Sequence, residues 1–243
     1  MIDPLTEALI AARAGGPKLS DSAETGLSRE RVLMVQQQVA DRLGPVGAFK
    51  VACPPDAPIV MAPIFASDIY PATASLDLPH DEPIGIELEY GFRLTAPLPD
   101  PQDSDFVEKL RESVELLPVV EIVRTRLADV EQASADLKML DNQLNGGLVL
   151  GEPCRDWKEH DLTRATAYLR IGDEVLIDGT AQVPGGDAFA SLALLCRAIG
   201  THCGGLQVGQ VVITGSLNGL PWRMPPFDVQ ARIEGLAEIT FSL

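Results

Sequence analysis

Alternation of apolar and polar positions is clearest over residues 84–94. One set of alternating positions is apolar and the other contains two glutamates, the sets being Ile86, Leu88, Tyr90 and Phe92 against Glu87, Glu89, Gly91 and Arg93. A period of two places successive side chains on opposite faces of a sheet, so this segment is predicted to be a β-strand. Glu87 and Glu89 then share one face of that strand.

The rest of the pattern predicts a small helical part followed by a mostly antiparallel β domain. A helix capped by Ser28 is predicted to end near Leu43, after an earlier short helix that the Gly15-Gly16-Pro17 cluster terminates. Further strands are predicted over residues 46–51, 59–65, 116–123, 146–150, 166–171 and 174–181, with a last antiparallel pair around Glu234. Further helices are predicted over residues 104–114, 133–140 and 187–199. We therefore expect an α+β chain with an N-terminal helical segment over residues 1–45 and one larger domain over residues 46–243.

Composition and charge narrow the classes of function. The chain has 243 residues, of which 46% are hydrophobic, and it carries a formal net charge of -16. Such an acidic surface repels phosphate backbones and anionic lipid headgroups, so we expect neither a nucleic-acid nor a membrane partner. An anionic substrate would need a locally cationic site, such as a bound metal or a well-placed lysine or arginine.

Targeting signals and cysteines point to the cytoplasm. The sequence has no run of roughly 18 apolar residues, and residues 1–17 lack the basic start and apolar stretch of a signal peptide. The four cysteines lie far apart and form no C-x-x-C pair, which disfavours a zinc ribbon and a disulfide framework. We expect four reduced cysteines in a cytoplasmic protein.

Three glutamates are the strongest candidates for chemistry. Glu87 and Glu89 project from one face about 7 Å apart at the backbone, and Glu121 lies inside an otherwise apolar run. A buried ionised carboxylate needs a partner, and three carboxylates without a placed histidine or cysteine favour Mg²⁺ or Mn²⁺ over zinc. Two alternatives stay open: a solvated strand face for the Glu-x-Glu pair, and a salt bridge from Glu121 to Arg124 or Arg126.

Other polar positions allow more than one interpretation. Lys50 ends a short apolar strand, where the pattern favours a surface lysine over a cation that binds substrate. Asp68 is either a loop cap or a buried functional acid. Ser216 is not part of a G-x-S-x-G elbow, so a serine hydrolase is disfavoured, and the glycines around it are typical of a turn.

Seven short segments then add a family resemblance. In chain order they are residues 49–51, 64–68, 85–92, 117–123, 141–142 with 147–151, 212–217 and 234–239. Taken in this order, they resemble the 2-hydroxypenta-2,4-dienoate hydratase and 4-oxalocrotonate decarboxylase family of the fumarylacetoacetate hydrolase superfamily. The resemblance runs from about residue 45 to the end of the chain. It departs from the family pattern just after Lys50 and over residues 184–189, which border the substrate.

The resemblance implies a fold and a site. The fold would be a mixed, mostly antiparallel β-roll with a small N-terminal helical cap, and residues 46–243 would be its catalytic domain. Glu87, Glu89 and Glu121 would hold Mg²⁺ or Mn²⁺. Lys50 and Asp68 would be catalytic, and the substrate would contact Lys50, Asp141, Thr214, Gly215 and Ser216.

The resemblance also implies a reaction. Water would add to a 2-hydroxy-2,4-dienoate to give a 4-hydroxy-2-oxo acid in aromatic-compound catabolism, within a homo-oligomer that can associate with a pathway decarboxylase. The alternatives are a 4-oxalocrotonate-type decarboxylase and an inactive homologue that serves as an assembly partner.

Overall fold

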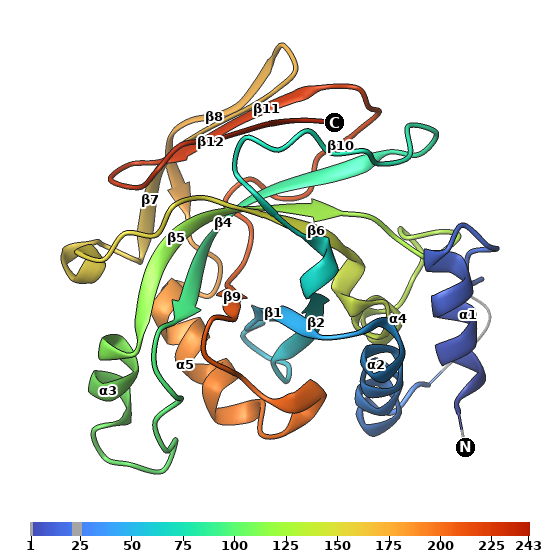
Figure 1. The fold of residues 1–243 in the computed structure, drawn as a ribbon, viewed down its shortest axis with the longest axis horizontal. Helices are drawn as coiled ribbons and strands as arrows, with labels where there is room; N and C mark the ends of the chain where they lie inside the picture. The colour runs from blue at the N-terminus through green and yellow to red at the C-terminus, as the bar shows by residue number, and fades with distance from the viewer. Residues whose placement is uncertain (1, 21–25) are drawn as a thin grey trace.

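The computed structural model describes residues 2–20 and 26–243, and a strongly curled β-sheet lies at its centre with a second sheet beside it (Figure 1). Residue 1 and residues 21–25, which fall within the predicted helical segment 1–45, lie outside the described residues. The helices are α1 (Pro4–Arg13), α2 (Arg29–Leu43), α3 (Phe106–Glu112), α4 (Ala135–Leu140) and α5 (Ala188–Ala198). The strands are β1 (Val46–Ala52), β2 (Val60–Phe65), β3 (Ile69–Pro71), β4 (Ile84–Leu94), β5 (Val114–Val123), β6 (Asn145–Leu150), β7 (Arg164–Ile171), β8 (Glu174–Gln182), β9 (Val211–Ile213), β10 (Trp222–Arg223), β11 (Asp228–Ile233) and β12 (Ile239–Ser242).

Most strand pairs are antiparallel, as predicted. The larger sheet has the order β2-β1-β9-β4-β5-β6-β3, and β10 pairs with the start of β4. Two of its pairs, β1 with β9 and β3 with β6, are parallel. The smaller sheet, β12-β11-β7-β8, is antiparallel throughout. The predicted mixed, mostly antiparallel α+β fold is confirmed.

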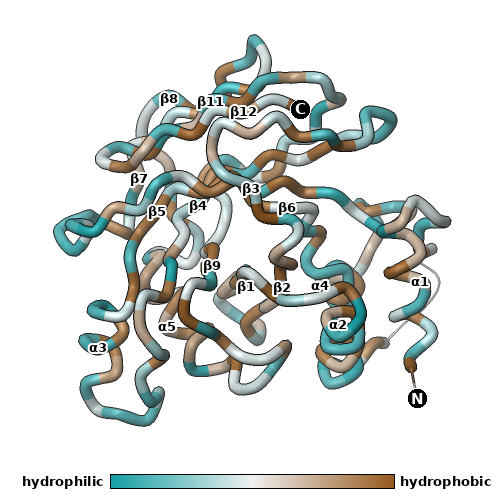
Figure 2. The backbone as a smooth tube through the Cα atoms, in the orientation of Figure 1, coloured by the Kyte–Doolittle hydropathy of each residue, from teal (hydrophilic) through white to brown (hydrophobic). Residues whose placement is uncertain are grey.

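The two faces of β4 are buried against different cores. Ile86, Leu88 and Phe92 belong to the main core, which extends to the helices and the smaller sheet. A smaller apolar cluster lies inside the curl, where five strands contribute Ala48, Ile64, Leu117, Val119, Leu148, Val211 and Ile213. In Figure 2 hydrophobic stretches recur along the strands of both sheets and on the helices, whereas the loop before α3 is mostly hydrophilic. A polar side chain that points into the curl is therefore surrounded by apolar walls.

Two helices, α2 and α5, begin at their predicted capping residues. The Ser28 side chain accepts a hydrogen bond from the first turn of α2, and Asp187 accepts two from the first turn of α5. α2 buries Val32, Val35 and Val39 on one face. Caps of this kind satisfy backbone donors that have no partner inside the helix. The two predicted helix starts are confirmed.

Some predictions about the elements need correction. The helix expected over residues 104–114 ends at Glu112, because Val114 pairs with Leu94 and already belongs to β5. β3 and β10 were not predicted, since two or three residues show no period. The division at residue 45 falls between α2 and β1, and its status as a domain boundary stays a prediction. Among the described residues, no helix has the length and apolar character that crossing a membrane requires.

Candidate metal centre

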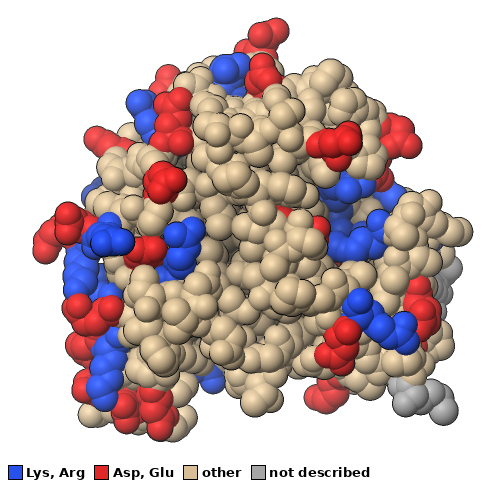
Figure 3. All heavy atoms as spheres, viewed as in Figure 1, with Lys and Arg blue, Asp and Glu red and all other residues tan. Residues whose placement is uncertain are grey.

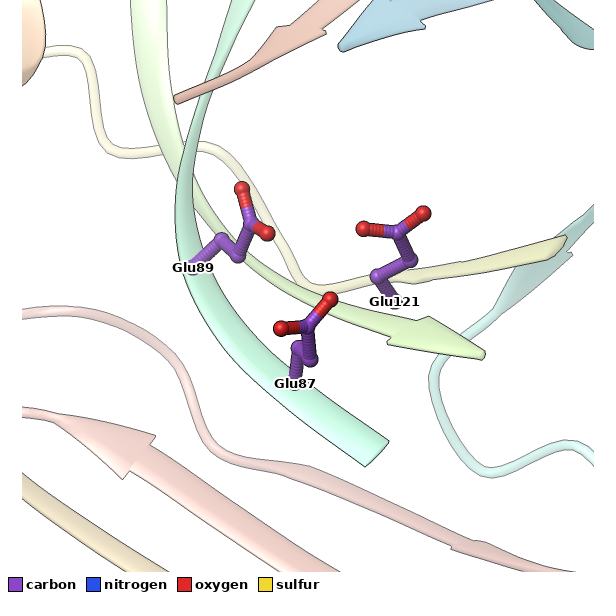
Figure 4. Close-up of side chains that lie close together, drawn as sticks. All are labelled: Glu87, Glu89 and Glu121. Carbon is purple, nitrogen blue, oxygen red and sulfur yellow. The ribbon is translucent and has the colours of Figure 1, made fainter. Parts of the chain in front are cut away.

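Three glutamates from two neighbouring strands converge inside the curl. Glu87 of β4 is the direct cross-strand partner of Glu121 of β5, and Glu89 lies one position further along the same face of β4. One carboxylate oxygen of each lies within 4.8 Å of the others, and Figure 4 shows the three side chains pointing into a common space. Like charges directly opposite each other destabilise a sheet, so this arrangement needs a compensating cation or protons.

Burial makes the three charges still less favourable. Glu89 is 2% exposed and Glu121 0%, while Glu87 is half-buried. Burial and the charge of Glu121 raise the pKa of Glu87 to about 7. Burial, Glu121 and Glu87 raise the pKa of Glu89 well above its ordinary value. Near neutral pH the centre therefore holds protons that a divalent cation would displace.

Lys50 supplies one positive charge to the centre. From β1, its ammonium donates to both oxygens of Glu121 at 2.7 Å and to the carbonyl oxygen of Gln143 at 3.1 Å. The Lys50 side chain is only 11% exposed. Burial alone would lower the pKa of Lys50, but the three carboxylates, Glu121 foremost, outweigh it and raise that pKa. The surface interpretation of Lys50, which the pattern favoured, is therefore wrong.

Glu121 does form a salt bridge, but with a partner that the sequence did not indicate. Arg124 pairs with Glu82 at 2.7 Å, and Arg126 pairs with Asp141. Lys50 binds Glu121 instead. One ammonium faces three carboxylates, so the salt bridge leaves the centre with excess negative charge.

The turn after β9 completes one side of the centre. The backbone N–H of Gly215 donates to Glu89 at 2.6 Å. The nearby Ser216 side chain, whose hydroxyl donates to the Gly219 carbonyl oxygen at 2.7 Å, offsets part of the raised pKa of Glu87. Thr214 is buried and bonds the carbonyl oxygen of Tyr90 at 3.3 Å. Gly215 has a φ of 116°, and a Cβ there would lie 2.9 Å from Pro184, so only glycine fits. The structure thus brings the predicted turn to the glutamates, while its contact with a substrate stays a prediction.

Asp68 lies in a different environment from the one expected. It is at the end of the short 3-10 helix η2 (Ala66–Asp68), is 24% exposed, and pairs with Arg13 at 3.1 Å. Asp68 and Arg13 line a cavity of about 650 Å³ together with Lys18 and Arg124. Figure 3 shows basic side chains gathered on this face next to α1. Of the two interpretations of Asp68, a fully buried acid does not hold, because the side chain is partly exposed and pairs with Arg13; its catalytic role stays a prediction.

Asp141 is buried behind the centre. It is 2% exposed, and its carboxylate accepts hydrogen bonds from the side chain and from the backbone N–H of Arg126. Arg126 therefore occupies the Asp141 carboxylate. The predicted contact of Asp141 with a substrate stays a prediction.

Two residues of the centre were missed. Asn145 donates from Nδ2 to Glu121 at 2.7 Å, and Gln143 offers its backbone carbonyl to Lys50. The side-chain oxygens of both amides are buried without a hydrogen-bond partner. In the sequence, Asn145 stands before two glycines and reads as a turn residue, so no signal pointed to it.

The donor set fits a hard divalent cation. Carboxylate and amide oxygens are the ligands that Mg²⁺ and Mn²⁺ prefer. Glu87, Glu89 and Glu121 offer three such oxygens within reach of one ion, and a positive ion would remove their mutual repulsion. The unpartnered oxygen of Asn145 is a further acceptor beside them.

The fold of this chain is similar to that of known structures. No family model matches the sequence. A solved structure of 4-oxalocrotonate decarboxylase from Pseudomonas putida G7, complexed with magnesium and adipate, matches over 98% of this chain and 95% of that chain, with a TM-score of 0.81 at 15% identity. The chain has the fold of this decarboxylase.

Two further solved structures match a smaller share of this chain. Fumarylpyruvate hydrolase from Pseudomonas aeruginosa, in complex with Mn²⁺ and pyruvate, matches over 80% of this chain and 88% of its own, with a TM-score of 0.57 at 15% identity. Fumarylacetoacetate hydrolase from Exiguobacterium antarcticum matches over 83% and 76%, with a TM-score of 0.57 at 13% identity. The predicted fumarylacetoacetate-hydrolase-like fold is confirmed, and identities this low establish the fold alone.

Proposed function

We propose that the chain is a divalent-metal-dependent enzyme that hydrates a 2-hydroxy-2,4-dienoate to a 4-hydroxy-2-oxo acid, with Mg²⁺ or Mn²⁺ as its cofactor. The observation that carries the proposal is the convergence of three inward-facing carboxylates with a single ammonium in an apolar curl. Structures of the same fold contain magnesium with adipate, or Mn²⁺ with pyruvate, so a metal beside a carboxylic or 2-oxo acid is compatible with this architecture.

Glu87, Glu89 and Glu121 would hold the ion, and Glu87 and Glu89 would give up their protons in doing so. When bound, the metal supplies a Lewis acid that stabilises negative charge on the C2 oxygen of the substrate. The Gly215 N–H keeps Glu89 oriented, and Asn145 keeps Glu121 oriented. The apolar floor, which includes Val119 and Ile213, excludes water and strengthens each electrostatic interaction at the centre.

Lys50 is the proton donor in this proposal. In the metal-free centre the carboxylates raise its pKa despite its burial, so it is charged at neutral pH. From its position against Glu121 it would give a proton to the far carbon of the dienol, and the water that adds to the resulting enone would return one proton to the lysine, so that Lys50 ends the reaction charged. Asp68 contacts Arg13 and not Lys50, so we assign it no proton transfer.

Decarboxylation of a 2-oxo-enedioate is the second candidate. It is favoured by the match to 4-oxalocrotonate decarboxylase, which covers almost the whole of both chains. That substrate has a second carboxylate and needs a second cation. The basic residues nearest in the sequence to Glu121 are Arg124 and Arg126, and both already pair with acids. We therefore place hydration first. An inactive assembly partner is the third possibility, and the complete carboxylate set argues against it.

Two substrates separate these functions. The purified protein is incubated with 2-hydroxypenta-2,4-dienoate or with 4-oxalocrotonate, each with Mn²⁺ and with EDTA, and the products are identified by mass spectrometry. Hydration adds one water to the first substrate, whereas decarboxylation removes CO₂ from the second. We expect hydration that EDTA abolishes and that Glu89→Gln abolishes, with the exposed Glu131→Gln as the matched control. Turnover that persists in EDTA would refute the proposal.

A further inference from the structure

A strained turn contacts the metal centre through Lys50. Its residues are Asn142, Gln143 and Leu144, which form the short helix η3 and have φ angles of 48°, 51° and 65°. Asparagine tolerates this left-handed region, whereas a glutamine or a leucine in it destabilises the fold by about 1 kcal/mol or more. Such strain persists only where surrounding contacts fix the backbone.

Arg126 supplies those contacts at both ends of the turn. Its guanidinium donates to the carbonyl oxygens of Asp141 and Asn145, each at 2.7 Å, and its Nε bonds the Asp141 carboxylate. Arg126 is 7% exposed and Asp141 2%, so water does not compete for these bonds. The planar fork of arginine makes this set of bonds possible, and a lysine ammonium cannot reproduce its geometry.

The strained turn also fixes two groups at the metal centre. It delivers the Gln143 carbonyl to Lys50 at 3.1 Å and the Asn145 amide to Glu121 at 2.7 Å. Asn145 is 1% exposed, and its side-chain oxygen is buried without a partner next to Glu121. A continuous set of hydrogen bonds thus runs from the Arg126–Asp141 pair to Glu121.

We propose that Arg126 and Asp141 are positioning residues: through the strained turn they hold Asn145 against Glu121 and so fix the orientation in which Glu121 receives a metal ion. This inference rests on the metal site of the proposed function. Groups that orient a metal ligand in this way typically change metal affinity by about ten- to a hundredfold. The free oxygen of Asn145 would accept a hydrogen bond from a water or a substrate hydroxyl bound at the same centre.

The test compares Mn²⁺ affinity with stability. Calorimetry gives the Mn²⁺ Kd, and urea unfolding in EDTA gives the stability, for the wild type, Asn145→Ala, Arg126→Lys and a control. The control is Arg31→Lys, because Arg31 also makes a two-pronged contact with an aspartate, Asp3, but between α1 and α2. We expect Asn145→Ala and Arg126→Lys to raise the Kd about tenfold or more, and Arg31→Lys to change stability alone.

A double variant tests the route of the effect. If Arg126 acts through Asn145, Arg126→Lys should raise the Kd less in the Asn145→Ala background than in the wild type. Full additivity in Mn²⁺ affinity would overturn the inference. If Arg126→Lys does not fold, Asn145→Ala decides alone, and an unchanged Kd overturns the inference. A wild type that binds no Mn²⁺ overturns the proposed function as well, which distinguishes the two failures.

Discussion

Replacement of Glu87 by glutamine should stabilise the metal-free protein above neutral pH. Burial and the charge of Glu121 raise the pKa of Glu87 from 4.5 in the unfolded chain to about 7 in the folded one. Between these two pKa values the folded protein keeps a proton on Glu87 that the unfolded chain has already released. A raised pKa of this kind contributes stability below the unfolded value, and that stability is lost as the pH rises through the folded value.

The expected size follows from the two pKa values. This difference lowers the free energy of unfolding of the wild type by about 3 kcal/mol at pH 8 and by less than about 1 kcal/mol at pH 5, relative to a protein in which Glu87 stays protonated. Because Glu87 is only half-buried, solvent screening makes this an upper value. Glutamine has the shape of the protonated acid and carries no charge at any pH. The charge of Glu87 also raises the pKa of Glu89, so its removal relieves Glu89 as well.

The assay is urea unfolding in EDTA at pH 5 and pH 8, followed by tryptophan fluorescence, to which the buried Trp157 contributes. Glu87→Gln should be more stable than the wild type at pH 8 and nearly equal to it at pH 5, whereas the exposed Glu131→Gln should match the wild type at both. Added Mn²⁺ should stabilise the wild type at pH 8 far more than Glu87→Gln. Equal pH dependence in the wild type and Glu87→Gln would show that the three carboxylates do not repel one another as argued.

Three further predictions concern the same centre. Lys50→Met removes the buried positive charge that pairs with Glu121 and should destabilise the metal-free protein by about 3 kcal/mol in urea unfolding at pH 8. Added Mn²⁺ should restore most of the lost stability. Unchanged stability would mean that Lys50 is not the compensating charge. Mn²⁺ affinity measured by calorimetry should fall as the pH drops from 8 to 6, because protons on Glu87 and Glu89 compete with the ion, and a flat profile would contradict their raised pKa values. Gly215→Ala should lower stability by about 1 to 3 kcal/mol and weaken Mn²⁺ binding, because the added Cβ collides with Pro184 and displaces the N–H that holds Glu89. Wild-type stability and wild-type Mn²⁺ affinity in this variant would refute the close approach.

The local part of the site could be predicted from the sequence. Alternation over residues 84–94 placed Glu87 and Glu89 on one face, and the apolar run around Glu121 marked that residue as a buried acid in need of a partner. Both statements depend only on the two-residue period of a strand and on the cost of burying charge. The cross-strand register of Glu87 with Glu121 then follows once β4 and β5 pair.

The long-range part could not be predicted. The contact of Lys50 with Glu121 joins residues 71 positions apart, and no local pattern distinguishes it from a surface lysine. The position of Asp68 depends on Arg13, which reaches it from α1. The role of Asn145 depends on positive φ angles at Gln143 and Leu144, residue types that do not signal a left-handed turn.

The parallel pairing of β1 with β9 has a consequence for how the protein acquires its centre. Lys50 lies opposite Ile213 in this pair, and β1 joins β4 and β5 only through β9, so β9 must be in place before β1 can join the rest of the sheet. Contacts so distant in sequence are slow to form, because the intervening loop must close first. A growing or truncated chain can therefore complete the β4–β5 hairpin, with all three glutamates, before Lys50 and the Gly215 turn are in place. Until then the three acids would face one another without their ammonium partner, and metal capture would coincide with the final steps of folding.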